Sequence, residues 1–382
     1  MGCAALAVTI PVFLYGTLCH LPLLRVVLGR DPQWRAARLP GHRVLAVEGE
    51  SFPILVEGNG IARGILLEGL DRADRDRLDF FERGFGYAPH ATLVETEGGD
   101  RVQAMVYRPQ PGRWRAGDPW RLGDWVRKWG DVTTLAAQEA MALYQAGQGD
   151  RMAQRWPMML MRAGAAVRAR KSEAPATLRR PCAPGDIVVD HWSQPYANYF
   201  AVEENDLRFR RFDGGMSPVV NRAAFVSGDA VVVLPFDPVR DRVLLVEQVR
   251  MGAHGRGDPQ PWLIETVAGR VDGGETPEEA ARREAREEAR LELRDVLPVL
   301  ECYPSPGAMT EYLYLFVALT DLPDTAAGIA GADDEHEDIR VHVVTFERMM
   351  HLIETGEINT APLILLAQWL SRERERLRAA DS

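Results

Sequence analysis

Glu284, Glu287 and Glu288 are spaced so that their three carboxylates emerge from one face of a predicted helix. Thr276 is a good N-cap for this helix, and Pro277 suits its first position. Three carboxylates this close repel one another unless a cation binds among them. Their hard oxygen atoms are ligands that Mg²⁺ and Mn²⁺ prefer. The spacing therefore indicates a divalent-metal site, and the alternative is a solvated surface helix rich in charge.

The stretch from Gly269 to Leu291 resembles the box of the Nudix hydrolases, G-x5-E-x7-R-E-U-x-E-E-x-G-U, in which U is apolar. The residues on the pattern are Gly269, Glu275, Arg283, Glu284, Ala285, Glu287, Glu288 and Leu291. Arg290 departs from it, because the family has glycine there. We expect a left-handed residue at this helix end, which costs a non-glycine residue on the order of 1 kcal/mol. The departure concerns the helix exit and leaves the carboxylate face intact.

The composition is that of a globular protein with two or three domains: 382 residues, 46% hydrophobic and 26% charged. The net charge of −10 and the lack of a lysine/arginine run argue against a nucleic-acid partner. Four cysteines form no C-x-x-C pair, which indicates a reducing cytoplasm and neither a zinc ribbon nor a redox pair. No apolar run reaches the roughly 18 residues of a membrane helix. The apolar N-terminus lacks a basic segment and is interpreted as a first strand, not a signal peptide.

The first half of the chain alternates between strand and helix patterns. Strands are predicted at 43–47, 61–67, 91–95 and 102–107, with helices at 20–28 and 71–82. This alternation predicts a small mixed α+β barrel. Residues 120–170 are predicted to be mostly helical and to close the first domain. The proline-containing segment 171–185 is the predicted linker.

This half resembles the γ-glutamylcyclotransferase-like family in the run Phe13–Leu18 and in the run Leu78–Glu82, which is followed by Tyr87. The resemblance implies that the turn Tyr15-Gly16-Thr17-Leu18 offers backbone N–H groups to a substrate's carboxylate. It also implies that Glu82 moves protons while an amine attacks a γ-amide, which requires a carboxyl group of raised pKa in an apolar pocket. The alternatives are a plain strand-to-helix turn and a surface carboxylate.

From residue 186 the pattern becomes rich in strands and ends in two helices. Strands are predicted at 187–192, 199–202, 207–212, 230–236, 243–249, 262–267, 312–318 and 340–344. One helix is predicted to begin near Phe346, and another, capped by Thr360, to run to about Ala379. A mixed sheet flanked by helices is the α/β/α sandwich of the Nudix fold.

From Asp186 to about Leu377 the chain resembles the ADP-ribose pyrophosphatases, in runs such as Trp262–Gly269, Val246–Arg250 and Glu335–His342. The resemblance implies that Mg²⁺ or Mn²⁺ is held by the carbonyl of Ala268 and by Glu284, Glu287 and Glu288. Arg283 and Glu275 would pair and orient the helix. Glu335 would be the general base, with Glu337 in reserve. The implied substrate-binding residues are Arg250, Arg222, Phe200, Glu265, Gly307 and Glu311.

The predicted architecture is therefore a γ-glutamylcyclotransferase-like domain (1–170), a linker (171–185) and a Nudix domain (186–382) that forms a homodimer. The first functional hypothesis is metal-dependent hydrolysis of ADP-ribose to AMP and ribose 5-phosphate. The second is hydrolysis of another nucleoside diphosphate sugar, and the third is a nucleotide sensor whose first domain only binds a partner. Fusions of this layout carry a tellurite-resistance label, although no residue here supplies chemistry for tellurite.

Overall fold

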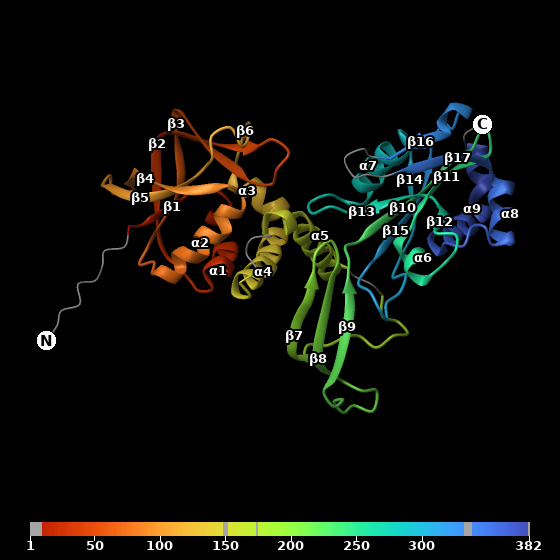
Figure 1. The fold of residues 1–382 in the computed structure, drawn as a ribbon, viewed down its shortest axis with the longest axis horizontal. Coiled ribbons are helices and arrows are strands. Elements are labelled where there is room, and N and C mark those ends of the chain that lie inside the picture. Colours follow the sequence, from red (N-terminus) through yellow and green to blue (C-terminus); the bar gives the residue numbers. More distant parts are fainter. Residues whose placement is uncertain (1–9, 148–151, 173–174, 332–337, 381–382) are drawn as a thin grey trace. The chain divides into compact units, whose positions relative to one another are not determined.

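The computed structural model describes residues 10–147, 152–172, 175–331 and 338–380 (Figure 1). The chain forms two compact units, Met1–Lys171 and Ser172–Ser382. In the described residues, no helix is long and apolar enough to span a membrane. The described residues from 175 to 185 are exposed to solvent. Arg180 of this segment nevertheless donates hydrogen bonds to the carbonyl of Arg210, so part of the predicted linker is held against the second unit.

The first unit is built on a closed five-stranded barrel. Its strands are β1 (Val12–Leu14), β2 (Gln33–Val47), β3 (Pro53–Glu68), β4 (Tyr87–Thr96) and β5 (Arg101–Pro109). They follow the order β3-β1-β5-β4-β2, and β2 pairs with β3 to close the ring. β1 is apolar throughout because both of its faces are covered: Phe13 packs inside the barrel, and Leu14 packs against the helices. A short strand, β6 (Ala116–Pro119), pairs with β2.

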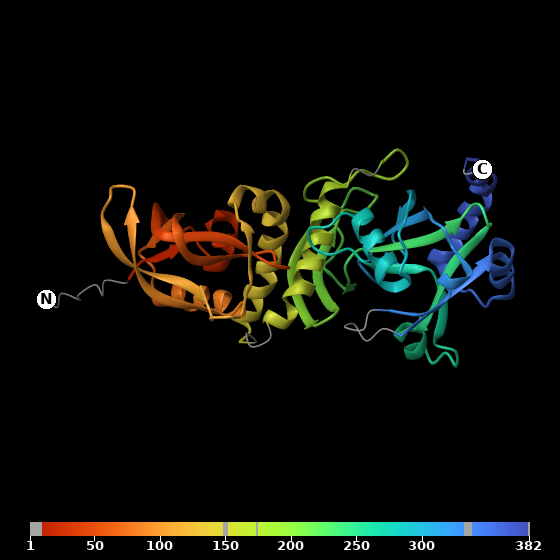
Figure 2. The ribbon, with the colours of Figure 1, turned by 90° about the horizontal axis from the view of Figure 1, so that it is seen from above.

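Five α-helices accompany the barrel in the described part of the first unit. They are α1 (Leu21–Leu28), α2 (Arg72–Gly84), α3 (Leu122–Trp125), α4 (Asp131–Gln145) and α5 (Met152–Lys171). A capping box between Asp71 and Asp74 begins α2, and its Leu78 and Phe81 are buried. α4 and α5 lie side by side (Figure 2) and join the same apolar core through residues such as Ala140 and Met159. The mixed barrel predicted from the alternating pattern is confirmed.

The second unit contains an eight-stranded mixed sheet. Its strands are β10 (Ala230–Asp237), β11 (Arg242–Val249), β12 (Trp262–Glu265), β13 (Val267–Arg270), β14 (Val296–Cys302), β15 (Leu313–Leu319), β16 (Gly328–Ala330) and β17 (Ile339–Thr345). The order is β14-β15-β10-β11-β17-β16, with β12 paired to β11 and β13 paired to β10. Alternate residues of β10 enter two different apolar cores, since Val231 and Leu234 face opposite sides of the sheet.

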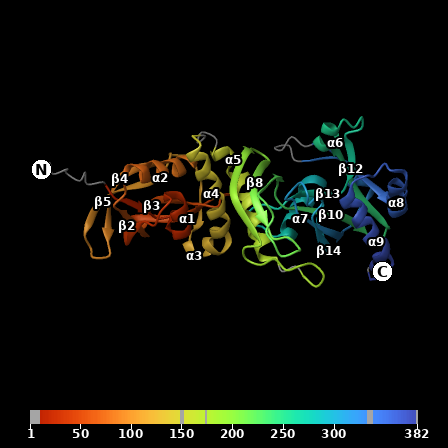
Figure 3. The ribbon, with the colours of Figure 1, turned by 90° about the horizontal axis from the view of Figure 1, so that it is seen from below.

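Helices cover both faces of this sheet. α7 (Pro277–Ala289) packs on one face through Ala281 and Ala285, and α8 (Phe346–Thr355) and α9 (Ala361–Ala380) pack on the other (Figures 1 and 3). A short helix, α6 (Met251–Arg256), follows β11. The predicted α/β/α sandwich is confirmed.

A separate three-stranded antiparallel sheet precedes the sandwich. It consists of β7 (Ile187–Ala197), β8 (Ala201–Phe209) and β9 (Val220–Val226). The sequence predicted strands at 199–202 and 207–212, and this was wrong, because one strand spans the polar residues between them. The sequence also missed β9, β14, β16 and α6. The strand predicted at 262–267 is two strands, which separate at Thr266 and pair with different neighbours.

Candidate functional site

The helix that carries the three glutamates begins and ends as its sequence dictates. The Thr276 side chain accepts a hydrogen bond from the Glu279 amide at 3.2 Å, and Glu279 accepts one from the Thr276 amide at 2.8 Å. This reciprocal cap confirms the predicted start of α7. Arg290 ends the helix in the left-handed region, at φ 53° and ψ 35°. The expected left-handed residue is therefore present. It is an arginine, whose Cβ atom makes this backbone conformation unfavourable.

Gly269 lies against the side chain of Glu284. A Cβ atom added at Gly269 would stand 1.9 Å from the nearer carboxylate oxygen of Glu284. Only a residue without a side chain lets β13 approach α7 this closely. The glycine of the box therefore sets the spacing between the strand and the carboxylate face of the helix.

Arg283 gathers the carboxylates of the box around its guanidinium group. It donates to Glu275 at 2.7 Å, to Glu284 at 2.7 Å and to Glu287 at 3.0 Å, and also to the Arg270 carbonyl at 2.8 Å. Burial acts to lower the pKa of Arg283, but the hydrogen bond to Glu275 and the charge of Glu284 outweigh it. The pKa of Arg283 is therefore raised well above its usual value.

Glu288 faces the strand instead of the guanidinium group. It is 3% exposed, and its Oε2 accepts a hydrogen bond from the Ala268 amide at 3.0 Å. Within the residues that the structure describes, no group of three or more histidine, cysteine, aspartate or glutamate side chains is placed to hold a metal ion. The donor chemistry nevertheless suits a cation, because Glu284 and Glu287 already share one positive group, that of Arg283.

The predicted substrate-binding residues fall into two groups. Arg250 forms an ion pair with Glu265 of β12. Glu311 lies near this pair, and burial raises its pKa, while the charges of Arg270 and Arg250 and a hydrogen bond from Ser227 act against that rise. Gly307 lies on an exposed loop that contacts β9 through the hydrogen bond from the Phe225 amide to the Ala308 carbonyl, 2.8 Å long.

Arg222 is not brought to this site. Arg222 is exposed on β9, where its guanidinium group donates to the carbonyl of its neighbour Asn221. Glu335 and Glu337 lie outside the described residues.

An aromatic cluster stands beside the box. The Arg270 guanidinium group lies over the ring of Tyr199 at 4.1 Å and over that of Phe200 at 4.8 Å, measured to the ring centroids. Phe200 also packs against Phe225 of β9, with 4.6 Å between centroids. The cluster places flat apolar rings next to charged groups that belong to the box and its strand.

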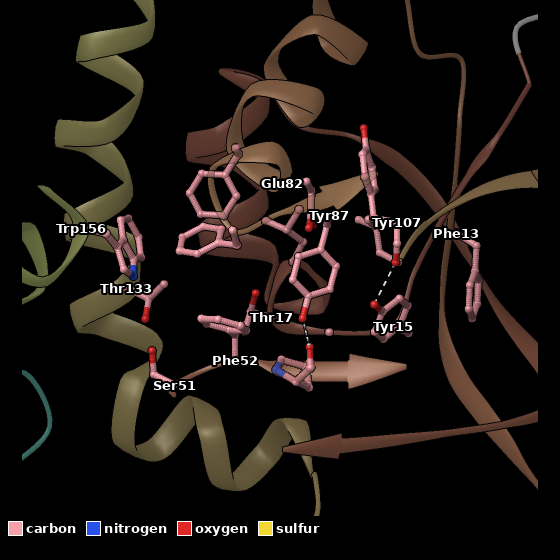
Figure 4. A pocket seen from close by; sticks show the side chains of 16 residues that line it. Phe13, Tyr15, Thr17, Ser51, Phe52, Glu82, Tyr87, Tyr107, Thr133 and Trp156 are labelled. Carbon is pink, nitrogen blue, oxygen red and sulfur yellow. Dashed lines mark hydrogen bonds between the residues drawn. The ribbon is translucent and has the colours of Figure 1, made fainter. Parts of the chain in front are cut away.

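The first unit contains a pocket at one end of its barrel (Figure 4), which we call the barrel pocket. Its lining includes the whole turn Tyr15–Leu18, together with Glu82 from α2, Thr133 from α4 and Trp156 from α5. The segment after the turn is a short 3₁₀ helix, Thr17–Cys19, and α1 begins only at Leu21.

Glu82 contributes a carboxyl group to the lining of this pocket. Burial, and secondarily the charge of Asp79, raises the pKa of Glu82 to about 8. Among the described residues, none donates a hydrogen bond to its carboxyl group. The carboxyl group therefore holds a proton near neutral pH and can exchange it with a group that enters the pocket.

Three tyrosines line the barrel pocket, and protein groups already engage their hydroxyls. Tyr15 donates to the Tyr107 carbonyl at 2.8 Å, Tyr87 to the Pro53 carbonyl at 2.9 Å, and Tyr107 to Asp79 at 2.6 Å. Burial raises the pKa of all three phenols, so they stay protonated. Their hydroxyls therefore bond to the walls of the pocket, and Glu82 is the lining group whose pKa lies near neutral pH.

Comparison with known proteins decides the family of the second unit. Residues 226–366 match the family profile of the NUDIX domain. A 183-residue segment, 48% of this chain, is 44% identical to the ADP-ribose pyrophosphatase of Escherichia coli strain K12 and covers 87% of that protein. The chain belongs to the Nudix family.

Other relatives of the Nudix unit carry two different names. The ADP-ribose pyrophosphatase of Haemophilus influenzae is 37% identical over 48% of this chain and 85% of its own length. The GDP-mannose pyrophosphatase of Enterobacter sp. strain 638 is 33% identical over 45% of this chain and 88% of its own length. A crystal structure of an ADP compounds hydrolase matches with a TM-score of 0.39 and 23% identity, covering 50% of this chain and 98% of that one.

The first unit matches a different family. Residues 12–127 match the profile described as gamma-glutamyl cyclotransferase, AIG2-like. The match ends within the short π-helix Val126–Gly130 that follows α3, so α4 and α5 lie beyond it.

Sequence reasoning missed several side chains at the two sites of this Nudix protein. Arg270 and Tyr199 of the aromatic cluster were not singled out, although Arg270 directly follows the first glycine of the box. Thr133 and Trp156 were missed as well, because a helical pattern does not reveal which cavity a residue lines.

Proposed function

We propose that the Nudix unit hydrolyses the diphosphate of ADP-ribose to AMP and ribose 5-phosphate in a metal-dependent reaction. The box carries this proposal, since Glu284 and Glu287 share the guanidinium group of Arg283, and Glu288, on the same helix, lies against the Ala268 amide of β13. The 44% identity to a protein named ADP-ribose pyrophosphatase supplies the substrate.

The residues that would hold Mg²⁺ or Mn²⁺ are Glu284, Glu287, Glu288 and the carbonyl of Ala268. A bound divalent cation neutralises a diphosphate and lowers the pKa of water. Arg283 and Glu275 keep the helix in place, because their ion pair joins α7 to the loop before it. Gly269 keeps the strand close to Glu284.

In the reaction itself, Glu335 accepts the proton of the attacking water, and Glu337 is the reserve for this role. The water oxygen bonds to one phosphorus atom while the bridging P–O bond breaks, so two monophosphates leave. Arg250 offers a guanidinium group to the diphosphate or the terminal ribose, held in place by Glu265. Glu311 and the Gly307 loop line the ribose side.

The test is turnover of a panel of nucleotide sugars by the full-length protein, with and without Mg²⁺. We expect ADP-ribose to be hydrolysed fastest and only with the metal. Equal turnover of GDP-mannose, with ADP-ribose ignored, would favour the second hypothesis, which the 33% identical GDP-mannose pyrophosphatase keeps open. Binding of ADP-ribose without any turnover would favour a nucleotide sensor.

We further propose that two chains associate through the Nudix unit. The three-stranded sheet leaves large apolar side chains exposed, among them Trp192, Tyr196 and Tyr199. Across such an interface Arg222 and Phe200 would serve the adenine site of the neighbouring chain. Sedimentation analysis should give a dimer, and Tyr196→Asp should shift it towards the monomer.

The remaining expectations stay proposals. The chain would act in the cytoplasm, without a nucleic-acid or membrane partner, and its domains would be 1–170 and 186–382, joined by 171–185. The tellurite-resistance label is tested by growth of a deletion strain on tellurite.

For the first unit, we propose a ligand site in the barrel pocket. The turn Tyr15-Gly16-Thr17-Leu18 would bind a carboxylate, and Glu82 would carry the proton. The supporting observation is a carboxyl group of raised pKa in the same pocket as the turn. Release of 5-oxoproline from γ-glutamyl amines would establish a cyclotransferase, and binding without release would leave a ligand-binding role.

A further inference from the structure

The barrel pocket has a wall that lies outside the part of the chain matched by the cyclotransferase profile. That match covers residues 12–127, whereas Thr133 and Trp156 come from α4 and α5. In Figure 4, Thr133 and Trp156 lie on one side of Phe52, and Tyr15 and Tyr107 lie on the other. Tyr15 of the turn and the two later helices therefore line different parts of the pocket, whereas Thr17 of the turn lies beside Phe52.

Thr133 brings a buried hydroxyl that no described residue satisfies. The residue is 5% exposed, and its Oγ1 has no hydrogen-bond partner in the described structure. A helical threonine ordinarily bonds back to the carbonyl four residues earlier, and the next residue does this: Thr134 donates to the Gly130 carbonyl at 2.7 Å. A buried polar group left unpaired calls for a partner from outside the protein.

Trp156 supplies an aromatic surface whose position is fixed. Its ring meets those of Phe85 and Phe81 edge to face, at 5.1 and 5.8 Å between centroids. The helix that carries it stays close to α2, because a Cβ added at Gly84 would stand 2.0 Å from the terminal methyl carbon of Met152. The Trp156 ring is therefore packed against the aromatic side chains at the end of α2.

Few polar side chains of the pocket remain available to a ligand. The three tyrosine hydroxyls are engaged by protein groups. In the described structure, Glu82, Thr17, Ser51 and Thr133 line the pocket without side-chain hydrogen bonds. The polar groups of a ligand can pair with this set and with the backbone N–H groups of the turn.

We infer that α4 and α5 recognise the amine portion of the ligand: Trp156 packs against its apolar part, and Thr133 hydrogen-bonds a hydroxyl or amide group on it. This rests on the proposal that the barrel pocket binds γ-glutamyl amides. If the turn holds the carboxylate end and Glu82 meets the amide, the amine portion extends towards α4 and α5. The two helices thereby set which amines the first unit accepts.

The first experiment needs no ligand and uses the full-length protein. Thr133→Val keeps the shape of the side chain and removes the unpaired hydroxyl, so we expect the first unit to melt about 2–4 °C higher. Thr134→Val is the matched control, and it should not stabilise, because it removes a hydrogen bond that is made. A lower melting temperature for Thr133→Val would mean that the hydroxyl serves the fold, and the inference would fail.

The second experiment measures binding of three probes by calorimetry: γ-glutamyl ethylamide, γ-glutamyl 2-hydroxyethylamide and γ-glutamyl benzylamide. Thr133→Val should weaken the hydroxyethylamide by about 3- to 10-fold and leave the ethylamide unchanged. Trp156→Ala should weaken the benzylamide by about 10-fold or more, and Trp156→Phe should restore part of that loss.

The outcomes separate the two proposals. If the wild type binds these amides and the variants bind them equally well, the role of α4 and α5 is wrong and the ligand site stands. If the wild type binds none of them, the γ-glutamyl amide proposal falls, and this inference falls with it. Release of 5-oxoproline in the same samples reports turnover separately from binding.

Discussion

The two units set the same side chain in opposite electrical surroundings. Glu82 of the first unit lies in an apolar pocket, where it has no cationic partner among the described residues, and its pKa rises to about 8. Glu284 and Glu287 of the Nudix unit both form ion pairs with the guanidinium group of Arg283. In the first arrangement the carboxyl group of Glu82 holds a proton. In the second, two carboxylates bind the positively charged guanidinium group of Arg283.

This contrast teaches that the residue type alone does not set the chemistry. Desolvation without a counter-charge makes a carboxyl group an acid–base catalyst or a hydrogen-bond donor. Carboxylates that repel one another on one helix face favour a positive group among them, which is the basis of the proposed cation site. The predictions below test the two settings in turn.

Removing one charge from the box should have the largest effect. Glu288→Gln keeps the size of the side chain and its acceptor for the Ala268 amide but loses the charge that attracts a cation. We expect ADP-ribose hydrolysis to fall by more than about 100-fold, measured as kcat/KM across a Mg²⁺ titration. Glu278→Gln, on the exposed first turn of the same helix, is the control. Recovery of the wild-type rate by excess Mg²⁺ would remove Glu288 from the ligand set.

The expected general base comes next. Glu335→Gln should lower kcat by roughly 100-fold, because the water then loses its proton acceptor, while the Mg²⁺ dependence stays the same. Glu337→Gln is the paired variant. If it costs more than Glu335→Gln, the role belongs to Glu337.

The close approach of strand and helix gives a structural prediction. Gly269→Ala places a Cβ atom where the Glu284 carboxylate now lies. The strand or the carboxylate must move, at a cost of about 1–3 kcal/mol in the free energy of unfolding, and hydrolysis should fall with it. Gly252→Ala, where an added Cβ meets nothing within 4 Å, is the control. Unchanged stability and activity would contradict the packing described here.

The proton on Glu82 predicts a dependence of stability on pH. The pKa is 4.5 for the unperturbed side chain and about 8 in the fold, so the folded unit binds more protons than the unfolded chain between these values. Its stability therefore falls as pH rises from about 4.5 to 8. Glu82→Gln should remove this slope in the melting temperature of the first unit, whereas the exposed Glu97→Gln should keep it. A slope that persists in Glu82→Gln would mean another group holds the proton.

The smallest effect is expected at the end of α7. Arg290 adopts a left-handed conformation that glycine adopts without strain. Arg290→Gly should stabilise the Nudix unit by up to about 1 kcal/mol, less the backbone entropy that glycine loses on folding. Thermal unfolding measures this, and a loss of stability would show that contacts of the arginine outweigh its conformation.

Local signals allowed parts of the fold to be predicted well. Thr276, Pro277 and the spacing of the glutamates fix α7 within a few residues of sequence. The missing glycine at Arg290 predicted a left-handed residue, and the structure has one. The helix predicted at 71–82 is also present. Asp71 caps it, and Leu78 and Phe81 lie on its buried face.

Features that depend on distant partners could not be predicted. The strand 262–267 breaks because Thr266 is buried and donates to the Val233 carbonyl at 2.6 Å, a contact between segments more than 30 residues apart. At the sites, glutamates inside a motif were found from the sequence. Thr133 and Trp156 were not, because only the packing of α4 and α5 against α2 brings them to the pocket.

The contact between Gly269 and Glu284 also constrains the number of residues between them in the box. The loop between them is held in place, because Glu275 accepts a hydrogen bond from the Asp272 amide at 2.7 Å and another from Arg283 at 2.7 Å. Inserting or deleting one residue there would set a side chain, instead of a glycine, against Glu284 or would break the Glu275 ties. Natural variation in this segment should therefore change residue identity freely at the open positions and almost never change the residue count.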